Sequence, residues 1–422
     1  MSQAQRLLAK TASLRPRWRR MLWRTGCLIF LLQCLVAMLL LIIASLGRRH
    51  KHDTRFPYRS LEEIQVGANR LQLYAYGEDL YKAMFEAIDN ASDYIYLESY
   101  IWKGDELGKE FQRRLAQKAA EGVKVYVIFD RFGNLVVPRT FKSGFDPAIH
   151  VLEYRAIRRP WQIFDLRHYA LDHRKLLVVD DTISFIGGYN IGELYAKEWR
   201  DTHLRLRGAI ATEFSQSFID FWNRFCPEKE QIREYHRRHF NPRIRLSQNE
   251  AMRLTFPIRD MYIVAIDKAA ESILLTTAYF IPDHILLDAL KNAARRGVDV
   301  RILVPWNSNH ILADWISRSY FAGCLQAGIH ILGYRHTMLH AKTCTIDEQW
   351  STVGTANLDR LSLLGNYEIN VEIYSKDFAQ QMQALFACDS SEVFELNAED
   401  WQRRAWYIKL SEHLLSPWRF MM

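Results

Sequence analysis

The sequence has few cysteines, and they form neither a disulfide scaffold nor a zinc site. Six cysteines are spread over 422 residues, and two of them, Cys27 and Cys34, lie inside an apolar run. No CxxC pair or cysteine–histidine spacing indicates zinc. No low-complexity segment is present, and 49% hydrophobic with 25% charged residues is an ordinary globular composition. These features exclude a disordered chain and a polytopic membrane protein, and the length predicts two or three domains.

The main part of the chain also lacks an excess of basic charge. The net charge is +8, but residues 1–59 contain twelve Lys or Arg and one acid, Asp53. The remainder holds 44 basic and 47 acidic side chains. A protein that follows a nucleic-acid backbone is expected to carry its basic residues on the binding domain. The distribution therefore predicts no nucleic-acid partner and favours a membrane surface.

One long uncharged run lies near the N-terminus. Residues 26–46 read GCLIFLLQCLVAMLLLIIASL, which matches the roughly 20 residues a helix needs to cross a bilayer. Trp23 and Arg24 precede the run, and Arg48 and Arg49 follow it, as interfacial anchors do. A buried helix and a cleaved signal peptide are the alternatives, and the absence of a clear small-residue cleavage site disfavours the peptide. We predict a retained single span, with the side of the main domain left open.

The rest of the chain contains an internal repeat. HRKLLVVDDTISFIGGYN begins at His173, and HAKTCTIDEQWSTVGTAN begins at His340. A shift of 167 aligns the two segments throughout and continues to Asp201 and Glu368. The aligned pairs are His173 with His340, Lys175 with Lys342, Asp180 with Asp347, Gly187 with Gly354, Asn190 with Asn357 and Asp201 with Glu368.

Each repeat is preceded by a pattern typical of strand, helix and strand. In the first, apolar residues at helical spacing run from Leu107 to Ala119 and end before Gly122, and VKVYVIF follows as a strand. Such alternation predicts an α/β sheet covered by helices. The predicted organisation is a basic segment 1–25, a transmembrane helix 26–46, a first half 60–225, a linker 226–255, a second half 256–395 and an amphipathic tail 396–422.

The paired motif contains residue types suited to chemistry on a phosphate. Lys175, Lys342, Asn190 and Asn357 offer cations and amide donors to non-bridging oxygens. His173 and His340 supply a nucleophile and a general acid, which are roles that require opposite protonation states. Asp201 and Glu368 are placed to hydrogen-bond the far ring nitrogen of a histidine each. With lysines as the cations, we expect neither a metal nor a cofactor.

Asp180 and Asp347 complete the repeated HxKxxxxD motif and are counted with its catalytic residues. Their position five residues beyond each lysine nevertheless favours a role in holding loops over direct catalysis.

The duplicated HxK(x)4D motif with downstream Gly and Asn resembles the signature of the phospholipase D superfamily. Further segments are similar to bacterial cardiolipin synthases: YIWKGDELG, AYFIPD, FIGGYNIG, WRDTHLRLRG and VGTANLDRLSLLGNYEIN. The resemblance implies two tandem α-β-α halves related by pseudo-two-fold symmetry, with the active site between them. It also implies membrane phospholipids as partners, in the bacterial inner membrane. The implied reaction moves a phosphatidyl group from one phosphatidylglycerol to the hydroxyl of another, giving cardiolipin and glycerol. A phosphohistidine on His173, protonation of the leaving group by His340 and independence of metal are implied as well.

Three other functions remain open: hydrolysis of phospholipids, a membrane-anchored nuclease and a catalytically dead adaptor. The acidic balance of the main domain counts against the nuclease, and two intact motifs count against the adaptor. Two segments also allow two interpretations each. The tail from Trp401 to Arg419 suits an interfacial helix or a packed one, and residues 310–323 suit a substrate-facing helix or ordinary core. The sequence leaves the oligomeric state undetermined.

Overall fold

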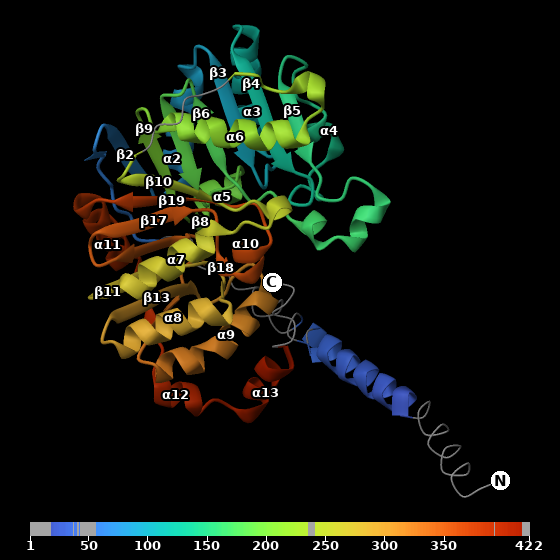
Figure 1. Ribbon diagram of the computed structural model, residues 1–422, viewed down its shortest axis with the longest axis vertical. Helices are drawn as coiled ribbons and strands as arrows, with labels where there is room; N and C mark the ends of the chain where they lie inside the picture. The colour runs from blue at the N-terminus through green and yellow to red at the C-terminus, as the bar shows by residue number, and fades with distance from the viewer. Residues whose placement is uncertain are drawn as a thin grey trace, which may run out of the picture.

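Two eight-stranded sheets form the body of the protein (Figure 1). The computed structural model describes residues 18–36, 38–39, 42, 56–234, 241–391 and 393–415. The first sheet contains β1 (Ile64–Val66), β2 (Asn69–Tyr74), β3 (Tyr94–Ser99), β4 (Lys124–Asp130), β5 (His150–Tyr154), β6 (Leu176–Val179), β7 (Ile183–Gly187) and β9 (His203–Arg207). The second contains β10 (Ile244–Gln248), β11 (Ser272–Thr276), β13 (Asp299–Pro305), β14 (His330–Tyr334), β16 (Thr343–Ile346), β17 (Trp350–Gly354), β19 (Ile369–Tyr374) and β20 (Phe394–Glu395).

The two sheets share one topology. The first has the order β1-β2-β9-β7-β6-β3-β4-β5, and the second has the order β10-β19-β17-β16-β11-β13-β14-β20. In the first, β3, β4 and β5 are parallel while β6, β7 and β9 are antiparallel. The same pattern recurs in the second sheet from β10 to β14. The α/β fold with tandem halves predicted from the repeat is therefore confirmed.

Helices cover the sheets and connect their strands. They are α2 (Gly77–Asp89), α3 (Glu106–Ala120), α4 (Arg139–Lys142), α5 (Glu193–Lys197), α6 (Ala211–Phe225), α7 (Pro257–Lys268), α8 (His284–Arg295), α9 (Ile311–Gln326), α10 (Arg360–Leu364), α11 (Lys376–Asp389), α12 (Ala398–Gln402) and α13 (Trp406–Leu415). Corresponding helices begin and end alike. Asp105 caps α3 and Asp283 caps α8 by accepting backbone N–H groups of the first turn. Gly122 and Gly297 follow the two helices with positive φ, which glycine adopts without strain.

The halves share a common hydrophobic core. One cluster of buried side chains combines Phe214 and Phe218 of α6 with Phe378 and Met382 of α11 and with strands of both sheets. Separate clusters lie between the first sheet and α2 and α3, and between the second sheet and α7 and α8. Because α6 and α11 pack into one core, the halves are held as a single folded body.

Four short strands join loops at the centre of the molecule. β8 (Trp199–Arg200) pairs with β15 (Met338–Leu339), so this pair joins the two halves. β12 (Phe280–Ile281) pairs with β18 (Leu358–Asp359) inside the second half. The stretch 226–255, predicted as a linker, contains β10, which forms the edge of the second sheet beside β19. That strand was missed because it begins at the end of the basic stretch 233–245, with which it was assigned to the linker.

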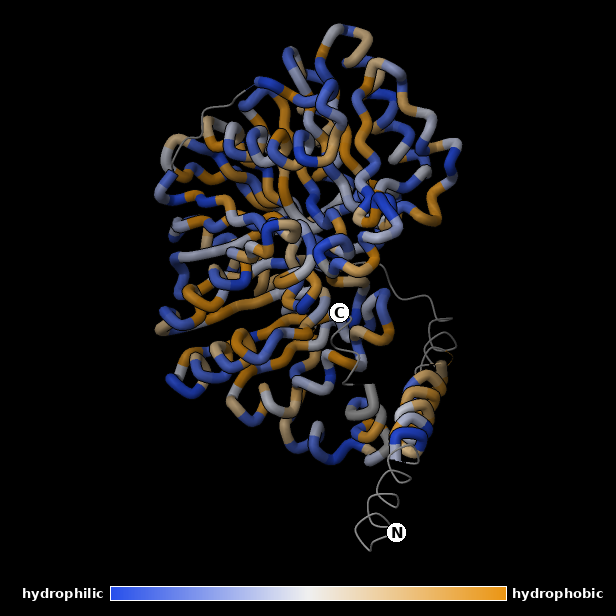
Figure 2. The backbone as a smooth tube through the Cα atoms, turned by 45° about the vertical axis from the view of Figure 1, so that its right-hand side comes forward, coloured by the Kyte–Doolittle hydropathy of each residue, from blue (hydrophilic) through white to orange (hydrophobic). Residues whose placement is uncertain are grey.

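The N-terminal part of the chain is helical over residues 18–36. The helix projects from the body, and its residues are mainly hydrophobic beyond a basic start (Figures 1 and 2). Within the described residues, we find no helix with the length and hydropathy required to span a bilayer. Several residues of the predicted span (37, 40–41 and 43–46) lie outside the described part, as does the basic segment before residue 18.

The two segments with open interpretations are both packed helices. Residues 311–326 form α9, whose Ile316 is fully buried as in an ordinary core helix, while Ala313 lines a central cavity. In the tail, Trp401 of α12 is buried in the core of the second half, and α13 lies against α9. Arg404 forms an ion pair with Glu412 there, while residues 416–422 lie outside the described part.

Candidate active site

A cavity of about 620 Å³ lies between the two halves. Both motif histidines, His173 and His340, line it together with Asn190 and Asn357. Each histidine stands a few residues before the strand of its motif, in the extended segments that enter β6 and β16. The structure thus brings together residues that are 167 positions apart in the sequence.

Backbone hydrogen bonds fix both histidines to the opposite half. The His173 N–H donates to the carbonyl of Tyr367 at 3.0 Å, and the His340 N–H donates to the carbonyl of Arg200 at 2.7 Å. Since Tyr367 and Arg200 are themselves 167 residues apart, the two connections are equivalent. Tyr367 directly precedes Glu368, and Arg200 directly precedes Asp201. Each histidine is therefore held by the segment of the opposite half that carries one of these acids.

The two acids cross between the halves. Glu368 accepts a hydrogen bond from His173 Nδ1, at 2.9 and 3.0 Å from its two oxygens. Asp201 accepts one from His340 Nδ1 at 2.6 Å. A carboxyl oxygen that accepts from Nδ1 keeps the proton there and leaves Nε2 as the reactive nitrogen. Neither half can therefore complete a histidine–carboxylate pair with its own residues.

Lys175 and Lys342 lie directly behind the histidines and are both buried. Each ammonium donates to the carbonyl of the histidine two residues earlier, at 2.7 Å for Lys175. Burial lowers the pKa of Lys342 to about 8, and burial together with repulsion by Lys342 lowers the pKa of Lys175 to about 7. Because the two ammonium groups repel each other, their site favours an anion.

The two histidine–acid pairs differ electrostatically. Burial raises the pKa of Glu368 to about 8, against the pull of Lys175. Burial also opposes ionisation of Asp201, but Lys342 and His340 hold its pKa below the ordinary value. For the histidines, burial lowers the pKa of His340 to about 3 and, with Lys175 and Lys342, takes that of His173 well below its usual range. At neutral pH Asp201 is ionised, whereas Glu368 favours its proton.

The two halves also differ at one position beside these acids. Gly188 leaves the space that the Asp201 carboxylate occupies, because a Cβ there would lie 2.1 Å from Asp201 Oδ1. The matching residue in the second half is Thr355, whose hydroxyl donates to Glu368. The longer Glu368 thus accepts a hydroxyl bond, while the shorter Asp201 is bonded at 2.7 Å by the Thr202 N–H.

Asp180 and Asp347 lie at the other end of their strands and do not line the cavity. The Asp180 carboxylate accepts the backbone N–H groups of residues 92–94 at 2.7–2.9 Å. Asp347 accepts those of residues 270–272 at 2.8–2.9 Å. Both have a φ near +51°, in turns that reverse the chain after β6 and β16. They join each motif to the loop that precedes β3 or β11.

Aromatic residues that the sequence analysis missed pack on the histidines. The Tyr100 ring lies 4.9 Å from His173, and the Lys175 ammonium lies 5.4 Å from the same ring. Trp199 lies 5.0 Å from His340. Each is the first residue of a segment quoted above, YIWKGDELG for Tyr100 and WRDTHLRLRG for Trp199, so their position at strand ends beside the site was the available signal.

The first half also contains a buried ionic cluster that the repeat did not reveal. Arg174 pairs with Glu98 at 3.1 Å, and Asp130 accepts the Asp172 N–H at 2.9 Å. Burial raises the pKa of Asp130 to about 6. Leu339 and Ala341 stand where Asp172 and Arg174 would be expected in the second half, so the repeat does not carry this cluster over to His340.

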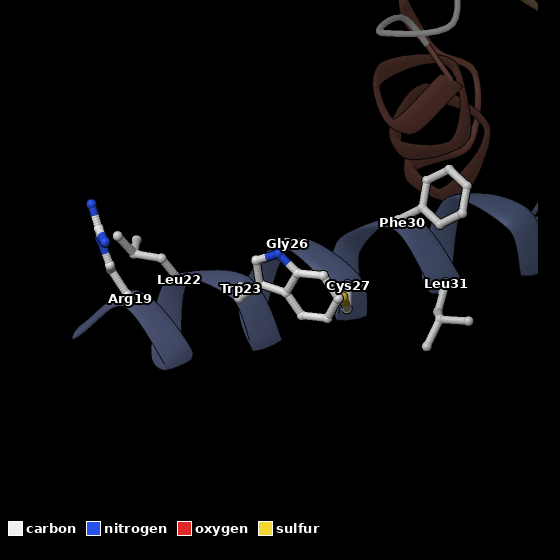
Figure 3. A pocket seen from close by; sticks show the side chains of 7 residues that line it. All are labelled: Arg19, Leu22, Trp23, Gly26, Cys27, Phe30 and Leu31. Carbon is white, nitrogen blue, oxygen red and sulfur yellow. The ribbon is translucent and has the colours of Figure 1, made fainter. Parts of the chain in front are cut away.

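The hollow along the N-terminal helix has fewer reactive side chains than the central cavity. The hollow along the N-terminal helix is larger, at about 790 Å³, but its walls come from a single helix (Figure 3). Its lining includes one charged residue, Arg19. Among the described residues, no group of three or more His, Cys, Asp or Glu side chains is arranged to hold a metal ion.

Comparisons with known proteins agree with this geometry. Residues 84–222 and 262–389 match the family model described as cardiolipin synthase, PLD-like domain. The chain is 34% identical over 368 residues to the major cardiolipin synthase of Bacillus subtilis (strain 168), covering 83% of this chain and 75% of that protein. It is 33% identical over 371 residues to a cardiolipin synthase of Listeria monocytogenes serotype 4a (strain HCC23), with the same coverage.

A solved structure has the same fold at low sequence identity. The phosphatidylserine synthase of Haemophilus influenzae Rd KW20 superposes with a TM-score of 0.62 at 14% identity, covering 87% of this chain and 96% of that one. The crossed histidine pairs, the duplicated sheets and these matches lead to one conclusion. The chain belongs to the cardiolipin synthase family of phospholipase D-like enzymes.

Proposed function

We propose that this enzyme makes cardiolipin by moving a phosphatidyl group from one phosphatidylglycerol to the hydroxyl of a second. The observation that carries the proposal is the pair of crossed histidine–acid contacts at one cavity, with two buried lysines behind them. Lys175, Lys342, Asn190 and Asn357 would hold the non-bridging oxygens of the phosphodiester. Such donors stabilise the charge that develops on phosphorus during transfer.

In the first step, Nε2 of His173 attacks phosphorus and forms a P–N bond. The P–O bond to the glycerol headgroup breaks, and His340 gives its Nε2 proton to the departing oxygen. In the second step, a hydroxyl of another phosphatidylglycerol gives its proton to His340 and attacks phosphorus. The P–N bond then breaks, which restores both histidines and yields cardiolipin.

The asymmetry of the two acids supports these roles. A nucleophile must be neutral, and Glu368 with its raised pKa adds no full negative charge beside His173. A general acid must be protonated, and the ionised Asp201 favours the imidazolium of His340. Because burial lowers the pKa of His340 to about 3, the negative charge of the bound phosphodiester has to raise it. Asp180 and Asp347 serve in this proposal as loop anchors.

Whether the phosphatidyl group passes to a lipid hydroxyl or to water depends on keeping water from the phosphohistidine. The cavity is lined by apolar side chains such as Phe132, Leu171 and Ala313 beside its polar groups. A lipid hydroxyl held near phosphorus would react ahead of water in such a site. We place the enzyme at the bacterial inner membrane, with residues 26–46 as a single span. Phosphatidylglycerol and cardiolipin are its proposed partners.

Chromatography of the lipid products tests the proposal. Purified protein given phosphatidylglycerol in liposomes should form cardiolipin and glycerol, with phosphatidic acid as a minor product. His173→Ala and His340→Ala should each abolish turnover, and acid-labile phosphate should be trapped on His173 in denatured enzyme. Activity should persist in excess chelator, because lysines supply the cations. Phosphatidic acid as the main product at every acceptor concentration would identify a phospholipase instead.

A further inference from the structure

Two loops beside the cavity expose large hydrophobic side chains. After β4, Leu135 and Val136 are 62% and 81% exposed. After β5, Trp161, Ile163 and Phe164 are 62%, 47% and 87% exposed. We call these five residues the rim surface. Scattered apolar residues are normal on a protein surface, but a local group with two aromatic rings indicates an interaction site.

The rim surface lies at the mouth of the proposed active site. β4 and β5 are neighbouring parallel strands, so the loops that follow them leave the sheet at one edge. The Arg131 N–H donates to the Tyr154 carbonyl at 2.9 Å and holds the loop starts together. Phe132 and Gly133 of the first loop line the cavity. The second loop forms the green lobe that projects from the first half, on the side where the N-terminal helix also lies (Figure 1).

Both loops are held in place by polar contacts of their own. Asn134 donates to the Tyr100 carbonyl at 2.8 Å, and Lys142 donates to the Asn134 carbonyl at 3.0 Å. In the second loop, the Tyr169 hydroxyl donates to the Ile163 carbonyl at 2.8 Å. Gln162 accepts the N–H groups of residues 158 and 159 at 2.7 and 2.9 Å. The exposed rings are therefore displayed by organised loops.

The charges around the rim surface are mostly positive. Between residues 155 and 169 there are four arginines and one acid, Asp165, which pairs with Arg167. The guanidinium of Arg159 lies 5.4 Å from the Trp161 ring, and no ion pair is found for it within the described residues. Arginine and tryptophan together are typical of the interface between water and lipid, and positive charge favours anionic headgroups.

We infer that the rim surface inserts into an anionic lipid bilayer and sets the cavity mouth at the headgroup level. This contact is separate from the N-terminal segment, since it is built from loops of the first half. It would let a phosphatidylglycerol headgroup pass along Phe132 into the cavity with its acyl chains still in the bilayer. Only this last step rests on the proposed function.

Tryptophan quenching by lipid tests the insertion in the full-length protein. The probe is a vesicle of phosphatidylcholine and phosphatidylglycerol that carries spin labels on shallow acyl positions. Trp161→Phe keeps the apolar ring but removes one fluorophore, so the lipid-quenched fraction should fall relative to the unaltered protein. Arg159→Gln should make quenching require a larger fraction of phosphatidylglycerol.

A kinetic comparison gives the second readout. The double variant Val136→Ser/Phe164→Ser should raise the KM for phosphatidylglycerol in vesicles by about five-fold or more, because less apolar surface enters the bilayer. Its rate on short-chain phosphatidylglycerol dissolved in water should stay within about two-fold, since neither residue lines the cavity. Val264→Ser on α7 is the matched control: Val264 is 51% exposed and lies outside the rim surface.

The outcomes separate the two proposals. Equal quenching in the unaltered protein and Trp161→Phe would overturn the insertion, whatever lipid product is formed. Persistent Trp161 quenching without cardiolipin formation would leave the insertion standing and refute the proposed function. A double variant that sediments as a smaller species, with unchanged quenching and KM, would make the rim surface an interface between copies of this chain and overturn the inference.

Discussion

At the scale of single residues, Gly188 is the position where the smallest change should have the largest effect. In Gly188→Ala the new Cβ would meet both Asp201 oxygens, at 2.1 and 2.4 Å, so the carboxylate must move away from His340. We expect kcat to fall by about 100-fold, as displacements near 1 Å can cause, with the fold retained. Gly323→Ala on α9 is the control, because its nearest neighbour is the flexible end of Lys291. Equal rates for both variants would contradict the proposed role of Asp201.

Glu368 should make the folded protein lose stability as the pH rises. Its pKa is raised to about 8 by burial, so between about pH 4.5 and 8 the folded state binds a proton that the unfolded state has released. Its contribution to stability is full at low pH and is lost as the pH rises through 8, at up to about 1.4 kcal/mol per pH unit. Glu368→Gln keeps the uncharged shape and should not show this loss.

Urea unfolding of both proteins at pH 5.5 and 7 measures this difference. Between pH 5.5 and 7, the free energy of unfolding of the unaltered protein should fall relative to that of the Glu368→Gln variant. The other buried acids with raised pKa values are present in both proteins and cancel; they are Glu98, Asp130, Asp172, Asp359 and Asp389. Parallel pH dependences would show that Glu368 is ionised in the folded state at neutral pH.

At the scale of elements, Asp180 should matter for stability more than for chemistry. Its carboxylate holds the turn after β6 to the start of β3 through three backbone N–H groups. Asp180→Ala should lower the free energy of unfolding by about 1–3 kcal/mol, a typical loss for bonds to a charged group. The folded Asp180→Ala protein should keep most of its kcat. Lys175→Met, which removes one of the two cations from the site, should not. A loss of kcat without a change in the unfolding midpoint would show that Asp180 takes part directly in catalysis.

The sequence predicted the elements well where the repeat was visible. The strand–helix–strand order and the helix end before Gly122 followed from spacing and patterning. The convergence of His173 and His340 was implied by the resemblance to the phospholipase D superfamily. It could not show which acid meets which histidine, because both pairings are compatible with a shift of 167. The packing of Tyr100 and Trp199 on the histidines was also hidden, since it depends on contacts between distant elements. β10 was missed because it begins at the end of a basic stretch that was assigned to the linker.

At the scale of the whole molecule, the proposed transfer should be reversible. One phosphodiester replaces another, so no energy input is needed. Purified enzyme given cardiolipin and high glycerol should regenerate phosphatidylglycerol, because glycerol then acts as the acceptor. Radiolabelled glycerol in the recovered phosphatidylglycerol is the measurement. Release of phosphatidic acid without incorporation of label would show that water, and not the alcohol, reaches the intermediate.

The fusion of both halves into one chain has a consequence for how such a site can evolve. In a symmetric dimer of identical subunits, every substitution appears twice, so both histidines keep the same surroundings. Here position 188 is glycine while its counterpart at 355 is threonine, and the acids are Asp201 and Glu368. Once the two copies share one chain, selection can act on each separately. Duplication followed by divergence thus allows one histidine to specialise in bond formation and the other in proton transfer.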